Sequence, residues 1–146
     1  MLSVLITMRA KSPLEDRIRE LESDLALTRM TVIELMAPKF QAVLHPPSSL
    51  DTHDALHRWY ENAVENVLEL AEIAAVTDPL GGTRRSACPL CGAEARNFYE
   101  QGPGFRYPEG LRRHLHGTHR SIQCAVIKAA LDLALSRFDR HERLGR

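Results

Sequence analysis

The sequence predicts a mainly α-helical protein, and three observations support this fold class. Three segments, at 14–35, 56–71 and 122–138, carry apolar residues at the three- and four-residue steps of a helix. Clusters of Pro, Gly and Ser at 46–49 and 78–82 separate these segments, and turns are expected there. The composition, with 44% hydrophobic and 26% charged residues, is that of a folded domain rather than a disordered chain.

The first helix is expected to begin at Pro13. Ser12 can cap it, proline fits the first helical position, and Glu15 can complete a capping box. Alternating steps of four and three residues then give a heptad seam over 14–35, formed by Leu14, Ile18, Leu21, Leu25, Thr28, Val32 and Leu35. Such a coiled-coil-like seam either packs inside its own chain or pairs with a second copy or a partner protein. The sequence leaves both alternatives open.

A second helix is expected after Pro38, which ends or kinks the first one, with its start near Asp51 or Thr52. Its apolar stripe is formed by Leu56, Trp59, Tyr60, Ala63, Val64, Val67, Leu70 and Ala71. An acidic ridge runs beside the stripe and consists of Glu61, Glu65, Glu69 and Glu72. We favour a solvated face for this ridge over a contact for a basic partner. The sequence therefore predicts a lead-in over 1–12 and a helical hairpin over 13–78, which would serve as a dimerisation or docking unit.

The C-terminal segment predicts a third long helix over 122–141. Its apolar stripe is formed by Ile122, Val126, Ala129, Ala130 and Leu133, with Phe138 as a candidate to extend it. Because this stripe needs a partner, we expect the helix to pack back onto the hairpin. It completes a second unit over 84–146, with the boundary between the units at the turn over 78–82.

Charge is distributed unevenly, although the net charge of the chain is zero. Residues 1–80 carry seven Lys and Arg against thirteen Asp and Glu, a net charge of −6. Residues 81–120 carry seven Arg against three Glu, a net charge of +4. An acidic half joined to a basic half suggests two different surfaces.

The sequence also favours a cytoplasmic protein without a membrane partner. No apolar run approaches the roughly 20 residues that span a bilayer. The apolar start MLSVLITM lacks the basic flank, the longer apolar core and the cleavage site of a signal peptide.

The three cysteines point to a metal site rather than to disulfides. An odd number of cysteines, two of them in the stretch CPLCG at Cys88 and Cys91, does not suit a disulfide framework. Downstream, the segment 111–119 supplies His114 and His119, which gives the pattern Cys88-x2-Cys91-x22-His114-x4-His119. Thiolate and imidazole donors in this pattern suit zinc.

Two alternatives to this ligand set stay open. His116 could replace His119, and Cys124 could replace a histidine. In every case four protein ligands would leave no open coordination position, so a single Zn²⁺ would be structural.

This segment, 88–119, resembles a Cys2His2 zinc finger. In that family an apolar residue lies three positions before the first histidine, as Leu111 does here, and an aromatic residue follows the second cysteine, for which Phe98 and Phe105 are candidates. Tyr107-Pro108-Glu109 resembles the start of the finger helix. The spacer of 22 residues is longer than the usual spacer of about 12.

The resemblance implies contact with nucleic acid. Positions equivalent to the base-reading ones are Tyr107, Gly110 and Arg113, which would read little sequence. Phosphate contact is the better expectation, through Arg84, Arg85, Arg106, Tyr107, Arg112, Arg113 and Arg120.

The function expected from the sequence is therefore a zinc-stabilised nucleic-acid-binding protein, a small regulator or accessory subunit. The alternative is a protein-interaction adaptor, in which zinc is only structural and the acidic helical half binds a partner. We expect no enzyme and no small-molecule substrate, because neither a glycine-rich phosphate loop nor a nucleophile elbow is found.

Overall fold

The computed structural model describes residues 12–48, 50–76, 83–94, 104–119 and 122–145. The elements are α1 (Pro13–Glu34), α2 (Pro38–Leu44), α3 (His53–Leu70), β1 (Ala74–Val76), β2 (Thr83–Ser86), β3 (Phe105–Arg106), α4 (Glu109–His116) and α5 (Ala125–Leu144). The prediction of a mainly helical fold is thus confirmed.

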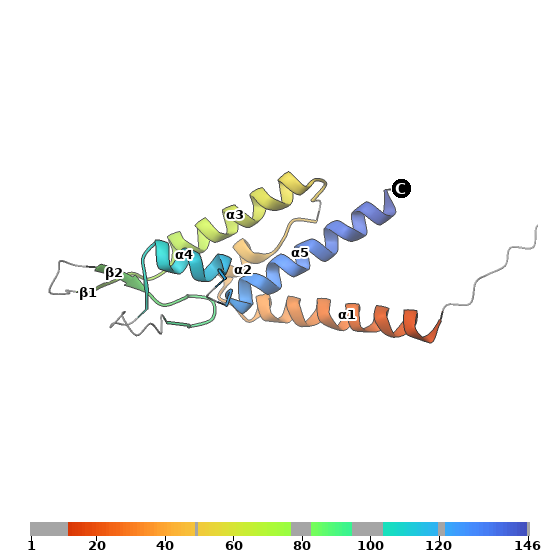
Figure 1. Ribbon diagram of the computed structural model, residues 1–146, viewed down its shortest axis with the longest axis horizontal. Coiled ribbons are helices and arrows are strands. Elements are labelled where there is room, and N and C mark those ends of the chain that lie inside the picture. The colour runs from red at the N-terminus through yellow and green to blue at the C-terminus, as the bar shows by residue number, and fades with distance from the viewer. Residues whose placement is uncertain (1–11, 49, 77–82, 95–103, 120–121, 146) are drawn as a thin grey trace, which may run out of the picture.

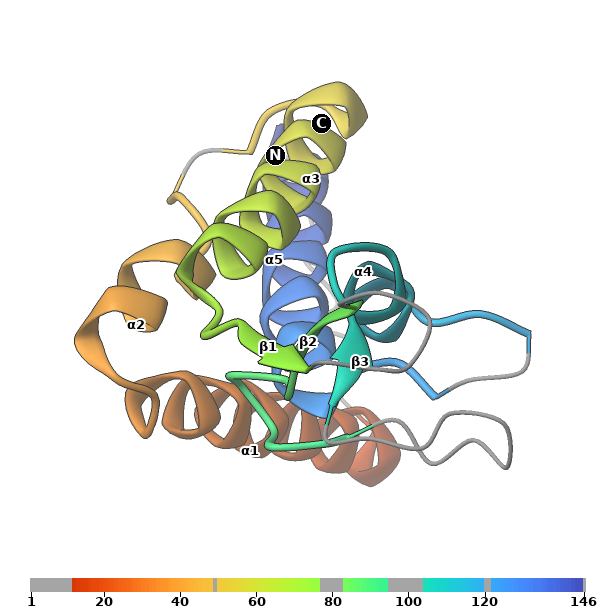
Figure 2. The ribbon, with the colours of Figure 1, turned by 90° about the vertical axis from the view of Figure 1, so that its left-hand side faces the viewer.

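The three long helices run along the molecule, and a small sheet closes one end (Figure 1). Helix α5 lies beside α1 and also contacts α3, and α4 packs against α3 and β3. The antiparallel sheet has the order β1-β2-β3, with Ala75 opposite Arg84 and Arg85 opposite Arg106. Seen along the long axis, the sheet and α4 lie together beside the start of α5 (Figure 2).

The helix starts follow from their capping residues. The backbone N–H of Glu15 donates to Ser12 Oγ over 3.2 Å, as the capping box predicts, and that of Ala55 donates to Thr52 Oγ1 over 3.1 Å. Pro38 separates α1 from α2 and occupies the first turn of α2. Among the described residues, no helix combines the length and the apolar character that crossing a membrane requires.

One hydrophobic core joins the N-terminal helices to the segment that carries the cysteines. Its buried members include Ile33 of α1, Val64 of α3, Leu111 of α4 and Ile127 of α5. The expected packing of the C-terminal helix onto the hairpin is therefore present. The turn at 78–82, where a boundary between two units is predicted, lies outside the described residues, as does most of the lead-in over 1–12.

The C-terminal helix begins three residues later than the sequence predicts. Ile122 was expected to open its apolar stripe, but it lies outside α5 and is 91% exposed. The reason is local, because the backbone N–H of Cys124 donates to the carbonyl of His114 over 2.9 Å. This bond fixes Cys124 against α4, and α5 starts only at Ala125.

Helix α1 has two apolar faces. One face packs on the core and α5 through Ile33, which is fully buried, and through the partly buried Ala26 and Met30. The other face carries the first half of the predicted heptad seam. We call it the α1 stripe, and its members remain exposed: Leu14 (69%), Ile18 (47%), Leu21 (44%) and Leu25 (50%).

The acidic ridge of α3 faces α4 in part. Arg112 Nε of α4 donates to Glu65 Oε1 over 3.0 Å, and its Nη2 donates to Glu65 Oε2 over 3.2 Å. His116 Nε2 lies 3.7 Å from Glu61 Oε2. Glu65 thus pairs with a basic residue of the same chain, so the unequal charges of the two halves offset each other across the contact between Arg112 and Glu65.

Candidate metal centre

Cys88 and Cys91 lie in a tight turn that follows β2. The backbone N–H of Gly92 donates to the carbonyl of Cys88 over 2.9 Å, and the N–H of Cys88 donates to the carbonyl of Ala93 over 2.9 Å. Gly92 has a φ of 72°, which a residue without a side chain adopts at little cost. The turn therefore brings two thiol groups, separated by two intervening residues, to the same side of the chain.

Two further donors come from the helices. His114 lies in the last turn of α4, and Cys124 directly precedes α5. The ligand atoms of Cys88, Cys91, His114 and Cys124 all lie within 4.8 Å of one another. These four residues are called the Cys3His cluster below, and they form a group that could hold one metal ion.

The distances inside the Cys3His cluster suit a tetrahedral zinc ion. Cys88 Sγ lies 3.8 Å from Cys124 Sγ, and Cys91 Sγ lies 3.2 Å from His114 Nε2. A zinc–sulfur bond of about 2.3 Å sets a sulfur–sulfur edge of about 3.8 Å in a tetrahedron. Three thiols and one imidazole are also a donor set that structural zinc sites use.

Hydrogen bonding and burial shift the pKa values of the three thiols in different directions. The Cys88 thiol donates to Cys124 Sγ, which lowers the pKa of Cys124 to about 4, with further help from His114 and from the backbone N–H groups of Ile127 and Val126 at the start of α5. The same hydrogen bond, together with burial, raises the pKa of Cys88. Burial also raises the pKa of Cys91. The lowered pKa of Cys124 favours its thiolate, whereas the thiols of Cys88 and Cys91, whose pKa values are raised, must lose protons to bind a metal.

The surrounding side chains hold these donors in place. The ring of Phe105 stacks on that of His114 with centroids 4.6 Å apart and an angle of 18° between the planes. Leu111 and Leu115 are fully buried and anchor α4 in the core. The amide of Gln123, next to Cys124, donates to the carbonyl of Leu115 over 3.0 Å. Leu111 is thus buried three positions before His114, and Phe105, one of the two aromatic candidates, contacts the His114 ring, whereas Phe98 lies outside the described residues.

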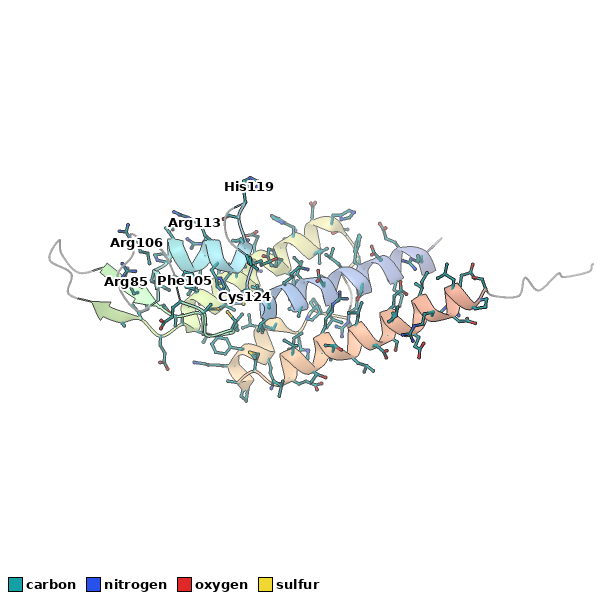
Figure 3. All side chains as sticks on the ribbon, turned by 60° about the horizontal axis from the view of Figure 1, so that its bottom comes forward. Arg85, Phe105, Arg106, Arg113, His119 and Cys124 are labelled. Atoms are coloured by element: carbon teal, nitrogen blue, oxygen red, sulfur yellow. The ribbon has the colours of Figure 1, made fainter. Side chains whose placement is uncertain are left out.

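The structure brings together three of the four predicted ligands and one of the alternates. His119 lies apart from the cluster, on the segment that leads away from α4, while Cys124 lies at the start of α5 (Figure 3). His116 points to Glu61 of α3 instead. The spatial grouping is therefore of the Cys3His type, and it favours the alternate Cys124 over His119.

The signal for Cys124 was present in the sequence. It is the third cysteine of a chain in which the other two form a CxxC pair, and an apolar helix follows it directly. The finger resemblance instead favours the histidine pair, because that family completes its site with two histidines. What the sequence could not show is the hydrogen bond from Cys124 N–H to the His114 carbonyl, which places the two ligands side by side.

The predicted nucleic-acid contacts fall into three groups. Three of them are engaged inside the fold: Arg85 is buried, Tyr107 Oη donates to the Leu68 carbonyl over 2.9 Å, and Arg112 pairs with Glu65. Three others are exposed and come from neighbouring elements, namely Arg84 of β2, Arg106 of β3 and Arg113 of α4. Arg120 lies outside the described residues.

Comparison with protein-family models, with curated proteins and with solved structures finds no match for this chain.

Proposed function

We propose that this protein is a zinc-stabilised protein-interaction adaptor. In this proposal one Zn²⁺ bound by the Cys3His cluster fixes the core, and the α1 stripe binds an apolar helix of a partner. The observation that carries it is the exposure of four large apolar side chains on a helix whose other face is already packed. Exposed apolar patches of this kind mark interaction surfaces on folded proteins.

The zinc part of the proposal is supported by where the four donors come from. They belong to the turn after β2, to α4 and to the start of α5, and the cysteine turn is far in sequence from the other two, with Cys91 23 residues from His114 and Cys88 36 residues from Cys124. An ion shared by all four would tie the sheet end of the molecule to the helices. Because the protein supplies four ligands, the ion would be structural, and the proposal includes no catalytic step.

The adaptor is preferred to a nucleic-acid-binding protein because of what the basic residues contact. Arg112 already has two acidic partners, Glu65 and Glu109, and Arg85 is buried. A phosphate would have to displace these contacts. The α1 stripe needs no such rearrangement, because its side chains already face solvent.

The adaptor is tested by measuring metal content and partner capture on the same sample. We expect about one zinc per chain. We also expect the wild type to capture partner proteins that a Leu21→Lys, Leu25→Lys variant does not capture. The matched control is Leu27→Lys, which changes an exposed leucine on another side of α1. Capture that is the same for all three proteins, or a folded protein without metal, would contradict the proposal.

A second candidate function is phosphate contact by a nucleic-acid-binding surface. It is favoured by the exposed Arg84, Arg106 and Arg113, because β2, β3 and α4 lie together at one end of the molecule (Figures 2 and 3). Its test is binding to short single- and double-stranded DNA and RNA across a salt series. Affinity that falls steeply with salt and is lost in Arg106→Glu, Arg113→Glu supports it. The control is Arg140→Glu, Arg143→Glu on α5, and the absence of binding at low salt rejects this candidate.

A further inference from the structure

We infer that the partner of the α1 stripe is a second copy of this chain, and that two α1 helices pair in parallel and in register. This inference rests on the proposed function, since it names the occupant of the same surface. The stripe follows steps of four, three and four residues, the spacing at which two helices interlock side chains along a seam. Thr28, the next position of the seam, is also exposed.

The stripe is accessible while α1 stays packed on α5. With 100° per residue, the stripe lies roughly a third of a turn around the helix from Ala26 and Met30, which pack against the core. Helix α1 also runs along the edge of the molecule in both ribbon views (Figures 1 and 2). A second helix could therefore bind the stripe without displacing α5.

Charges beside the stripe select a second copy in parallel orientation. In a parallel, in-register pair, the residue that directly precedes Ile18 or Leu25 of the seam faces the residue five positions later in the other helix. Arg17 would then face Glu22 of the second copy, and Asp24 would face Arg29 of the second copy. Both pairs are opposite in charge, and the twofold symmetry of the dimer forms each of them twice.

An antiparallel pair is less favourable. A pairing that sets Leu21 opposite Leu25 would bring Glu22 near Glu22 of the second copy, and Asp24 near Asp24 of the second copy. Like charges at the centre of the interface oppose association. The flanking charges thus discriminate between the two orientations.

The existing contacts of these residues are compatible with the pairing. Within the part of the chain that the structure describes, Arg17 pairs with Glu20 of its own helix, and this pair is exposed. Arg29 lies 3.7 Å from Asp132 of α5, but Asp132 has a closer partner in Lys128 at 2.8 Å. Arg29 can therefore turn to a second copy without leaving Asp132 unpaired.

The test is the mass of the zinc-loaded full chain in solution across a concentration series, by sedimentation or light scattering. We expect the mass to rise from 16.5 kDa towards twice that value. Leu21→Lys with Leu25→Lys should stay monomeric, with unchanged helix content and zinc content, while Leu27→Lys should dimerise like the wild type. A wild type that is monomeric at every concentration overturns the inference.

The parallel register has its own test, which changes only exposed residues. Arg17→Glu alone and Glu22→Arg alone should each weaken the dimer, because each places like charges opposite each other. An equal mixture of the two variants should restore association, because both contacts become attractive in the mixed dimer. The parallel arrangement is overturned if each single variant dimerises as strongly as the wild type, or if the mixture stays monomeric.

The outcomes separate this inference from the proposed function. A monomeric wild type that still captures other proteins through the α1 stripe leaves the adaptor standing and rejects the homodimer. A dimer that persists in Leu21→Lys, Leu25→Lys shows an interface elsewhere, which also rejects the homodimer through α1. If neither dimerisation nor stripe-dependent capture is found, both proposals fail.

Discussion

Arg112 of α4 lies 3.0 Å from Glu65 of α3, and this pair joins the basic segment of the chain to the acidic one. Two nitrogens of the guanidinium contact the two carboxylate oxygens, and Glu109 adds a third contact at 2.7 Å. The contact brings opposite charges of the two halves of the chain together. It also orients α4, the helix that carries His114, against α3.

We predict a small but measurable coupling between Arg112 and Glu65. Both side chains are partly exposed, so a double-mutant cycle with Arg112→Ala and Glu65→Ala should give about 0.5–1 kcal/mol, and this value should shrink at high salt. The control cycle on Arg17 and Glu20, an exposed pair on α1, should give less. Equal coupling energies for the two pairs in chemical denaturation would contradict the structural role of the contact.

Zinc binding should depend on Cys124 and not on His119. Cys124→Ser removes a buried thiol of the Cys3His cluster, so we expect zinc to be lost on dialysis and the melting temperature to fall. His119→Ala should keep both the metal and the melting temperature, because His119 lies outside the cluster. Metal analysis of the two purified variants checks this. The opposite pattern would restore the Cys2His2 ligand set.

Zinc affinity should rise with pH. The pKa values of Cys88 and Cys91 are raised, so both thiols hold protons near neutral pH and zinc must displace them. Cys124, with a pKa of about 4, is already a thiolate and releases none. We therefore expect about two protons released per zinc at pH 7.5. Calorimetry in buffers of different ionisation enthalpy measures this number, and a release of about three protons would show that Cys124 also starts protonated.

The sequence predicts local features well because neighbouring residues determine them. Ser12 caps α1 as expected, Pro38 separates α1 from α2, and Leu111 is buried three positions before His114 of the Cys3His cluster. The choice of the last ligand depends instead on tertiary structure. Cys124 belongs to the cluster because the chain after α4 turns back towards it, and no local sequence pattern predicts this turn. His119 has the spacing of a finger ligand, but it does not lie in the cluster.

The partners of the charged residues likewise could not be predicted from local sequence. The acidic ridge could be read from the spacing of its glutamates, but its partner could not, because Glu65 and Arg112 lie 47 residues apart in the chain. The fate of the heptad seam was likewise open. Burial shows that Val32 packs against the core while Leu14, Ile18, Leu21 and Leu25 remain exposed, so packing within the chain accounts for Val32 but not for these four residues.

Gly104 should tolerate no side chain. Its φ is 91°, and a Cβ placed there would meet the carbonyl carbon of Ser86 at 2.6 Å and the backbone nitrogen of Ala87 at 2.8 Å. This close approach sets β3 against the strand that leads into Cys88. Gly104→Ala therefore combines a left-handed backbone, which costs about 1–2 kcal/mol, with a backbone clash, and we expect the free energy of unfolding to fall by more than that.

Gly92 offers the matched control for this prediction. It also has a positive φ, of 72°, but a Cβ there would meet no atom within 4 Å. Gly92→Ala should therefore cost only the backbone strain of about 1–2 kcal/mol. Chemical denaturation of both zinc-loaded variants gives the two values. If Gly92→Ala is as destabilising as Gly104→Ala, the close packing of Gly104 on Ser86 contributes nothing, and the sheet does not hold the cysteine turn in the way the structure indicates.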